Sequence, residues 1–173
     1  MLIEAALLLP FLFALLFGII DFGYTFNDWI SVRQGGRDGL RQVIVKTNPT
    51  APGGGSWSCP VGSGGPASTS GDAYAITCFT KLRVGLDQNR TAVKVFWDTS
   101  GTNFAAGKPV KVCVQYRTSS LTRAYATLLD NKILDTEVES LIETTSTGLT
   151  STFQENSFPD GTAVNWSSTC GQL

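Results

Sequence analysis

Histidine is absent from this 173-residue chain, and methionine occurs only once. Without histidine there is no Ser-His-Asp or Cys-His arrangement, and the commonest general base of enzymes is missing. The four cysteines include no Cys-x-x-Cys spacing, so neither a zinc site nor a redox site is expected. These absences predict a protein that is not an enzyme and that binds no metal or cofactor.

Charge is also scarce. Charged residues make up 16% of the chain, and the net charge is -1. The sequence shows no concentrated basic face, so nucleic acid is not an expected partner. Glu137 and Glu139 would suit glycoside hydrolysis, but charges on an edge strand also prevent aggregation, and we favour the second interpretation. Likewise, Trp57, Trp97 and Trp166 suggest core or disulfide cover rather than a sugar-stacking surface.

The longest uncharged apolar run extends from Ala5 to Ile20, between the carboxylates of Glu4 and Asp21. As a helix these sixteen residues span about 24 Å, near the lower limit for crossing a bilayer. Apolar side chains cover every side of this helix. Such a helix is buried in lipid or in the middle of an assembly.

A carboxylate beside this apolar run is costly unless it is paired, so Glu4 indicates a function. Its nearest partner is the N-terminal ammonium of a neighbouring subunit, and that contact, repeated head to tail, builds a helical fibre. Pro10 removes a helix hydrogen bond, which indicates either a kink tolerated in lipid or a designed loosening of the helix.

No lysine or arginine precedes Arg33, whereas a signal peptide normally begins with basic residues. This indicates that Met1 lies at or near a processing site. If Met1 is the true start instead, the positive-inside rule places Arg33, Arg37, Arg41 and Lys46 in the cytoplasm, and the topology is inverted.

Arg33, Arg37 and Arg41 recur every fourth residue and form one helical stripe. The stripe is either a solvated face near lipid headgroups or a surface that meets acidic residues of a neighbouring subunit. Asp21 and Asp28 are the candidates for those acidic residues. Gly35, Gly36 and Gly39, which lie between these arginines, either allow close backbone approach or simply weaken the helix.

Several motifs at fixed spacings resemble the TadE-like pilins of the tight-adherence (Tad) branch of type IV pili. They are Ile3-Glu4, Leu9-Pro10, Gly18-Ile19-Ile20-Asp21-Phe22-Gly23 and Gly36-Arg37-Asp38-Gly39-Leu40-Arg41. The resemblance implies a leader removed by a prepilin peptidase, with the conserved glutamate at mature position five rather than four as here. It also implies a membrane-held subunit that assembly machinery polymerises with other pilins.

Residues 1–46 are expected to form the membrane and filament-core helix, and residues 47–173 a separate β-rich head. Residues 47–71 hold four prolines and seven glycines and form a loop. Strand-like runs cover residues 75–84, 92–98 and 110–116. Residues 133–143 fit a helix or a fourth strand, and we favour the strand. The fold class is therefore α+β, a long helix followed by a mainly antiparallel, type IV pilin-like head.

Four cysteines in a chain with an export-type N-terminus indicate two disulfides. Cys59 pairs most simply with Cys78, which lies on the expected strand 75–84. A bridge from Cys170 to Cys113 would hold the polar tail against the sheet.

We therefore expect a structural pilus subunit, held in the cytoplasmic (inner) membrane before assembly and in an extracellular adhesive filament afterwards. Residues Glu4, Pro10, Asp21, Arg33, Arg37 and Arg41 would serve assembly. The alternative is a single-pass, membrane-anchored module whose head binds a ligand and never polymerises.

Overall fold

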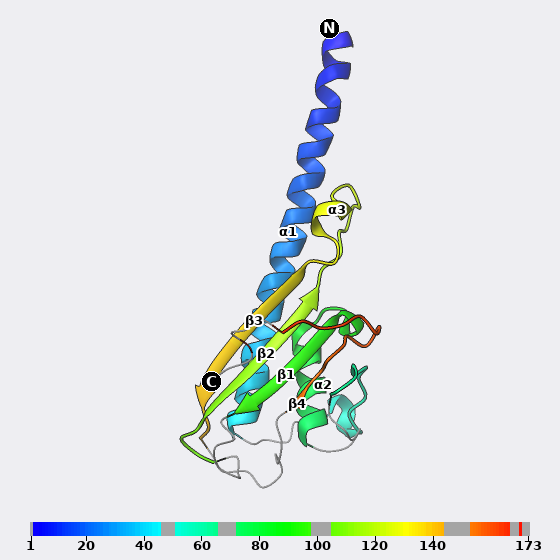
Figure 1. Ribbon diagram of the computed structural model, residues 1–173. Coiled ribbons are helices and arrows are strands. Elements are labelled where there is room, and N and C mark those ends of the chain that lie inside the picture. The colour runs from blue at the N-terminus through cyan, green and yellow to red at the C-terminus, as the bar shows by residue number, and fades with distance from the viewer. Residues whose placement is uncertain are drawn as a thin grey trace.

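The computed structural model describes residues 2–45, 51–65, 72–97, 105–143, 153–166 and 170, and leaves out the side chains of residues 2–5. Figure 1 shows one long helix whose C-terminal half lies against a β-sheet and whose N-terminal half projects away from the head. The elements in chain order are α1 Leu2–Val45, η1 Pro52–Gly54, α2 Asp72–Val84, η2 Gln88–Arg90, β1 Thr91–Trp97, β2 Pro109–Arg117, α3 Ala126–Leu129, β3 Ile133–Leu141 and β4 Phe153–Gln154. This arrangement confirms the α+β class.

The four strands form one antiparallel sheet in the order β3-β2-β1-β4. The expected strands at 92–98 and 110–116 are confirmed as β1 and β2, with Val93 opposite Val114. The segment that fitted both patterns is the strand β3, and it lies at one edge of the sheet. The sequence analysis assigned no strand to the tail, where β4 pairs with β1 at the other edge.

The strand expected at residues 75–84 is wrong, because this segment is the helix α2. Its valine, isoleucine, threonine and phenylalanine content suggested a strand, but tertiary packing overrides such preferences. The helical signal is the spacing of Ile76, Thr80 and Val84, which are all buried four residues apart. Thr80 also donates its hydroxyl to the carbonyl oxygen of Ile76 at 2.8 Å, a bond within one helical turn.

Two glycines of α1 allow α2 to pack closely against it. A Cβ atom added at Gly35 would lie 2.7 Å from the backbone nitrogen of Val84. One added at Gly39 would lie 2.3 Å from the Thr80 hydroxyl oxygen. Both distances are shorter than van der Waals contact. Close approach, rather than weakening of the helix, therefore accounts for glycine at these two positions.

The main core lies between α1 and α2 on one side and the inner face of the sheet on the other. Its fully buried members include Val32 and Val43 of α1 and the alternating valines of the two central strands, Val93, Val95, Val110, Val112 and Val114. Burying one such side chain contributes roughly 1.5 kcal/mol or more. This packing holds the C-terminal half of α1 rigidly against the head.

Both disulfides join the cysteines that the sequence analysis paired. Cys59 is bonded to Cys78, which lies on helix α2 rather than on a strand, and Cys113 is bonded to Cys170. The second bridge packs with Phe96 and Trp166 on the outer face of the sheet. Trp97 lies in the main core instead, so the tryptophans of the two sheet faces form no common sugar-stacking surface.

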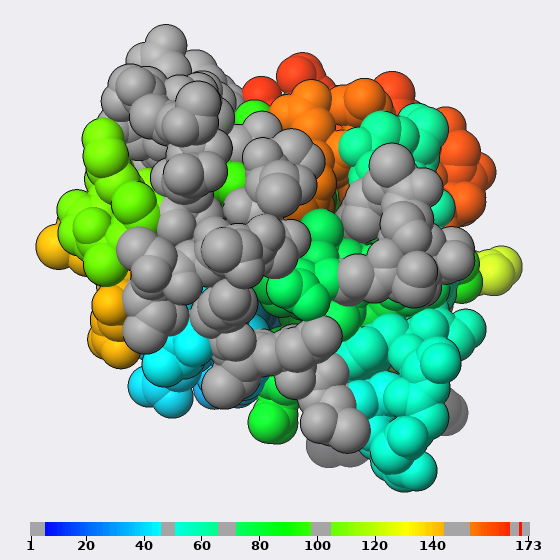
Figure 2. Space-filling model, turned by 90° about the horizontal axis from the view of Figure 1, so that it is seen from below, coloured from blue at the N-terminus to red at the C-terminus, as the bar shows by residue number. Residues whose placement is uncertain are grey.

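Of the loop expected at 47–71, the described part is residues 51–65. Figure 2, which views the head from the end opposite the N-terminus of α1, shows this segment and residues 153–166 on the surface, and the Asn156 backbone N–H donates to the Ser63 carbonyl oxygen at 2.6 Å. Glu155 joins the two segments, because its carboxylate accepts hydrogen bonds from the Gly62 backbone at 2.7 Å and from Lys81 at 2.7 Å. Burial lowers the pKa of the Lys81 ammonium, and the Glu155 carboxylate acts in the opposite direction.

Candidate assembly surface

The N-terminal half of α1 exposes a continuous apolar surface outside the head (Figure 1). The helix from Ala6 to Val45 is long and apolar enough to cross a membrane. Large side chains lie on all of its sides and remain 38–72% exposed: Leu7, Leu8, Leu9, Phe11, Leu12, Phe13, Leu15, Leu16, Phe17, Ile19, Ile20, Phe22, Tyr24 and Phe26. A surface of this kind on one chain indicates contact with lipid or with another protein.

The carboxylate of Asp21 binds a segment of its own chain. Its side chain is buried, and it accepts hydrogen bonds from the Thr122 backbone at 2.9 Å, the Thr122 hydroxyl at 2.7 Å and the Ser120 hydroxyl at 2.9 Å. The sequence analysis named Asp21 as one candidate to meet an arginine of a neighbour. Within the described chain, its carboxylate instead faces the loop between β2 and α3.

Asp28, the second acidic candidate, is also turned inward. It is 1% exposed, and neither carboxylate oxygen has a hydrogen-bond partner within the described residues. Tyr116 of β2 lies nearby, and burial, with a smaller contribution from Asp28, raises the pKa of its phenol to about 12. Asp28 therefore offers no surface to a neighbouring arginine.

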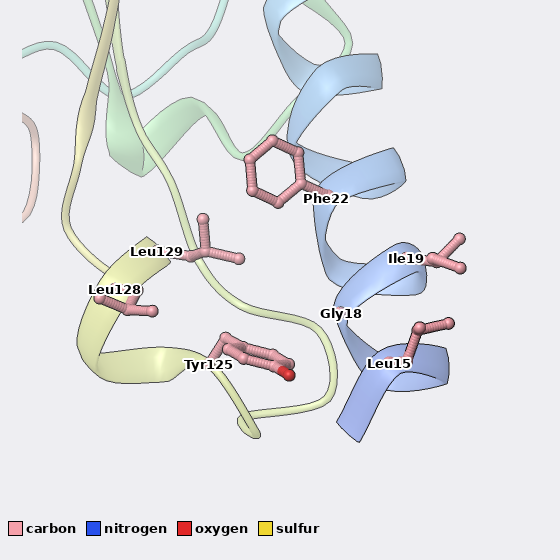
Figure 3. Close-up of a pocket in the computed structure, with 7 residues that line it drawn as sticks. All are labelled: Leu15, Gly18, Ile19, Phe22, Tyr125, Leu128 and Leu129. Carbon is pink, nitrogen blue, oxygen red and sulfur yellow. The ribbon is translucent and has the colours of Figure 1, made fainter. Parts of the chain in front are cut away.

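An apolar pocket of about 400 Å³ lies between α1 and α3 (Figure 3). It is lined by Leu15, Gly18, Ile19, Phe22, Tyr125, Leu128 and Leu129. Figure 3 shows the ring of Tyr125 beside the helix at Gly18, where a Cβ atom would lie 3.5 Å from the ring. The Tyr125 hydroxyl donates to the carbonyl oxygen of Ala14 at 2.7 Å. The α3 segment thus continues the apolar surface of α1 onto the head.

The three arginines of the predicted stripe are all exposed. Arg33 lies over the ring of Trp29, 4.8 Å from its centre. Arg37 is two residues from both Gly35 and Gly39, so it lies about 200° around the helix from the side that meets α2. Within the described residues, no ion pair engages the stripe.

The two remaining residues predicted to serve assembly lie on the projecting part of α1. Pro10 is inside the helix, which continues through it. Because proline has no N–H, the carbonyl oxygen of Ala6 lacks its usual helical partner. Glu4 also lies on α1, but its side chain is outside the described residues.

The sequence analysis underestimated the extent of a row of carboxylates on β3. Glu137 and Glu139 were identified, and Asp135 extends the same alternation. Lys111 of β2 contacts Glu137 at 2.6 Å and Glu139 at 3.5 Å. The hydrogen bond with Glu137 is the main reason that the pKa of Lys111 is raised. Within the described residues, no group of three or more histidine, cysteine or acidic side chains could hold a metal ion.

Comparison with known proteins identifies the N-terminal part of the chain. Residues 1–41 match the family model described as TadE-like protein, which covers about a quarter of the chain. No curated protein and no solved structure matches the chain. The matched segment includes the exposed apolar surface, Asp21 and the arginine stripe. The resemblance drawn from the motifs is therefore confirmed: residues 1–41 form a TadE-like segment.

Proposed function

We propose that this chain is a structural subunit of an extracellular, Tad-type type IV-like pilus that serves surface adhesion. Its role is mechanical rather than catalytic. The observation that carries this proposal is the exposed, all-round apolar half of α1 in a segment that matches the TadE-like family. The sheet and α2 pack on the other half of the helix, and the α3 segment contacts one side of the projecting half near Ala14 and Gly18, so the rest of that half is available for polymerisation (Figure 1).

Water is an unfavourable environment for the projecting half of α1. Each of its leucines and phenylalanines gains roughly 1.5–3 kcal/mol when it is fully removed from water. Lipid supplies the required surroundings while the subunit is held in the cytoplasmic membrane. In the filament, the helices of other subunits replace the lipid, and the heads face outward.

Glu4 and Pro10 have separate roles in this proposal. Glu4 pairs with the N-terminal ammonium of a neighbouring subunit and so fixes the stagger between helices. Pro10 leaves one carbonyl without its helical bond, which makes bending easier as the helix moves from bilayer to filament. Prepilin peptidase and the pilus assembly machinery are the expected partners before polymerisation.

Electron microscopy of material sheared from producing cells tests the proposal, together with mass spectrometry of its subunits and of their N-terminal residue. We expect uniform fibres that contain this chain, with a processed N-terminus. Fibres that contain only traces of it would identify a minor subunit. Recovery only from membranes, as discrete particles, would contradict the proposal and support an anchored ligand-binding module.

A further inference from the structure

We propose that the arginine stripe of one copy binds the carboxylate row of a second copy. The stripe consists of Arg33, Arg37 and Arg41 on α1, and the row of Asp135, Glu137 and Glu139 on β3. This inference rests on the proposed function and names a contact between subunits outside the apolar helices. In this contact the row replaces Asp21 and Asp28 as the acidic partner of the stripe, because both aspartates are buried inside their own chain.

The row points away from α1. Thr136 and Val138 face the helix, because a Cβ atom added at Gly36 would lie 3.0 Å from Thr136 and 3.5 Å from Val138. Side chains alternate between the faces of a strand, so the row lies on the opposite face. The side chains of Glu137 and Glu139 are 32% and 52% exposed. A second copy can therefore reach the row at this edge of the sheet.

The stripe and the row match in sign and in spacing. Successive arginines lie about 6 Å apart along the helix, and the whole stripe spans about 12 Å. Successive carboxylates lie about 6.7 Å apart along the strand, and the row spans about 13 Å. Each arginine can therefore meet one carboxylate when the helix of one copy lies along the strand of another. Lys111 offsets only one of the three negative charges in the row.

Within the described part of one chain, the stripe and the row form no ion pairs with each other. The stripe lies on a flank of α1, whereas the row points out of the far face of the sheet. Within the described part of the chain, the row pairs with Lys111, and no ion pair links it to the stripe. A contact between two different surfaces of identical subunits is heterologous, and its repetition produces a ring or a filament. Anionic lipid headgroups would suit the stripe but would add no partner for the row beyond Lys111.

Charge reversal tests the pairing. The first variant carries Arg33→Glu, Arg37→Glu and Arg41→Glu, so both of its surfaces are negative. The second carries Asp135→Lys and Glu139→Lys, which makes its row positive and keeps Glu137 with Lys111. We expect each variant alone to yield at least about tenfold less sheared filament, because like charges then face each other. Co-expression should restore filament, because each stripe then meets a row of opposite sign.

Arg83→Glu is the control, since it reverses an exposed charge on α2 that lies outside both surfaces and contacts Asp38 of its own chain at 3.8 Å. Non-reducing gels and melting temperatures establish that the heads have folded. Filament at wild-type levels from both variants would overturn the inference, and so would folded variants that fail to rescue each other. Loss only in the first variant would identify lipid headgroups as the partner of the stripe. Absence of filament from the wild-type chain would instead contradict the proposed function.

A cysteine pair tests the contact even if the reversed variants do not fold. One copy carries Glu139→Cys, at the end of the row rather than opposite Cys113, and the co-expressed copy carries Arg33→Cys or Arg41→Cys, at either end of the stripe. We expect a disulfide-linked dimer in sheared filaments with one of these two stripe variants, according to the direction in which the helix runs along the strand. Arg83→Cys with Glu139→Cys should give none. Equal cross-linking with Arg83→Cys, or none with either stripe variant, would overturn the inference.

Discussion

The ammonium of Lys81 contacts the carboxylate of Glu155 at 2.7 Å, and both side chains are completely buried. Lys81 also donates to the carbonyl oxygen of Pro60 at 2.8 Å, and Glu155 accepts from the backbone N–H of Val93 at 2.6 Å. The pair therefore links α2, β1, the loop and the tail. This connection holds the part of the head that lies away from the projecting half of α1.

Removing one partner of this pair leaves the other charge buried and unpaired. We expect Lys81→Met to lower the free energy of unfolding by about 3–5 kcal/mol. Thermal or urea unfolding of the full chain in detergent measures this loss. The double variant Lys81→Met with Glu155→Leu should lose less than the sum of the two single variants. Strict additivity would show that the two groups are not coupled.

Gly39 is predicted to be sensitive to the smallest side chain. In Gly39→Ala the new methyl group overlaps the Thr80 hydroxyl, so we expect destabilisation by about 1–3 kcal/mol. Gly23→Ala is the matched control, because a Cβ atom at Gly23 meets nothing within 4 Å. Alanine is the better helix former, so this control should be neutral or slightly stabilising. Equal melting temperatures for the two variants would contradict the proposed close packing of α1 and α2.

The carboxylate of Asp160 makes the stability of the head depend on pH in the acid range. Its carboxylate accepts a hydrogen bond from the backbone N–H of Thr162 at 3.0 Å and also pairs with Arg117, and these contacts lower its pKa from the usual value of an aspartate. A lowered folded-state pKa stabilises the fold above the unfolded pKa, and this stabilisation is lost as pH falls through the folded value. Asp160→Asn should therefore reduce the dependence of the unfolding free energy on pH below about pH 4. If the unfolding free energy of this variant falls with pH in this range as steeply as that of the wild-type chain, the carboxylate does not contribute.

Glu4 is predicted to affect assembly and not the fold of the head. The described contacts of the head with α1 begin near Ala14, ten residues further along the helix. Glu4→Ala should therefore leave the melting temperature and both disulfides unchanged while sharply reducing sheared filament. Wild-type amounts of filament from this variant would remove the proposed role of Glu4.

Patterns carried by neighbouring residues were sufficient to predict much of this fold. The uncharged run predicted the projecting helix, and the alternation of Val110, Val112 and Val114 predicted a strand with one buried face. The cysteine pairing followed from placing Cys59 in a loop and Cys170 in the tail. These features depend on local periodicity or on a simple count.

Features that depend on tertiary contacts were not predictable in the same way. Helix α2 is rich in β-branched residues, and its packing depends on the close approach of Val84 and Thr80 to Gly35 and Gly39 of α1. Asp21 looked available to a neighbour, because nothing in the local sequence indicates that Thr122 lies beside it about a hundred residues later. The arginine stripe was recognised from its spacing, but its proposed partner emerged only when β3 was placed at the sheet edge.

Helical reconstruction of sheared filaments by cryo-electron microscopy tests the central claim most directly. We predict that the apolar half of α1 lies in the filament core, surrounded by the same segment of other copies, with the heads outside. Filaments in which the heads make all the contacts and α1 lies outside the core would contradict polymerisation through this helix.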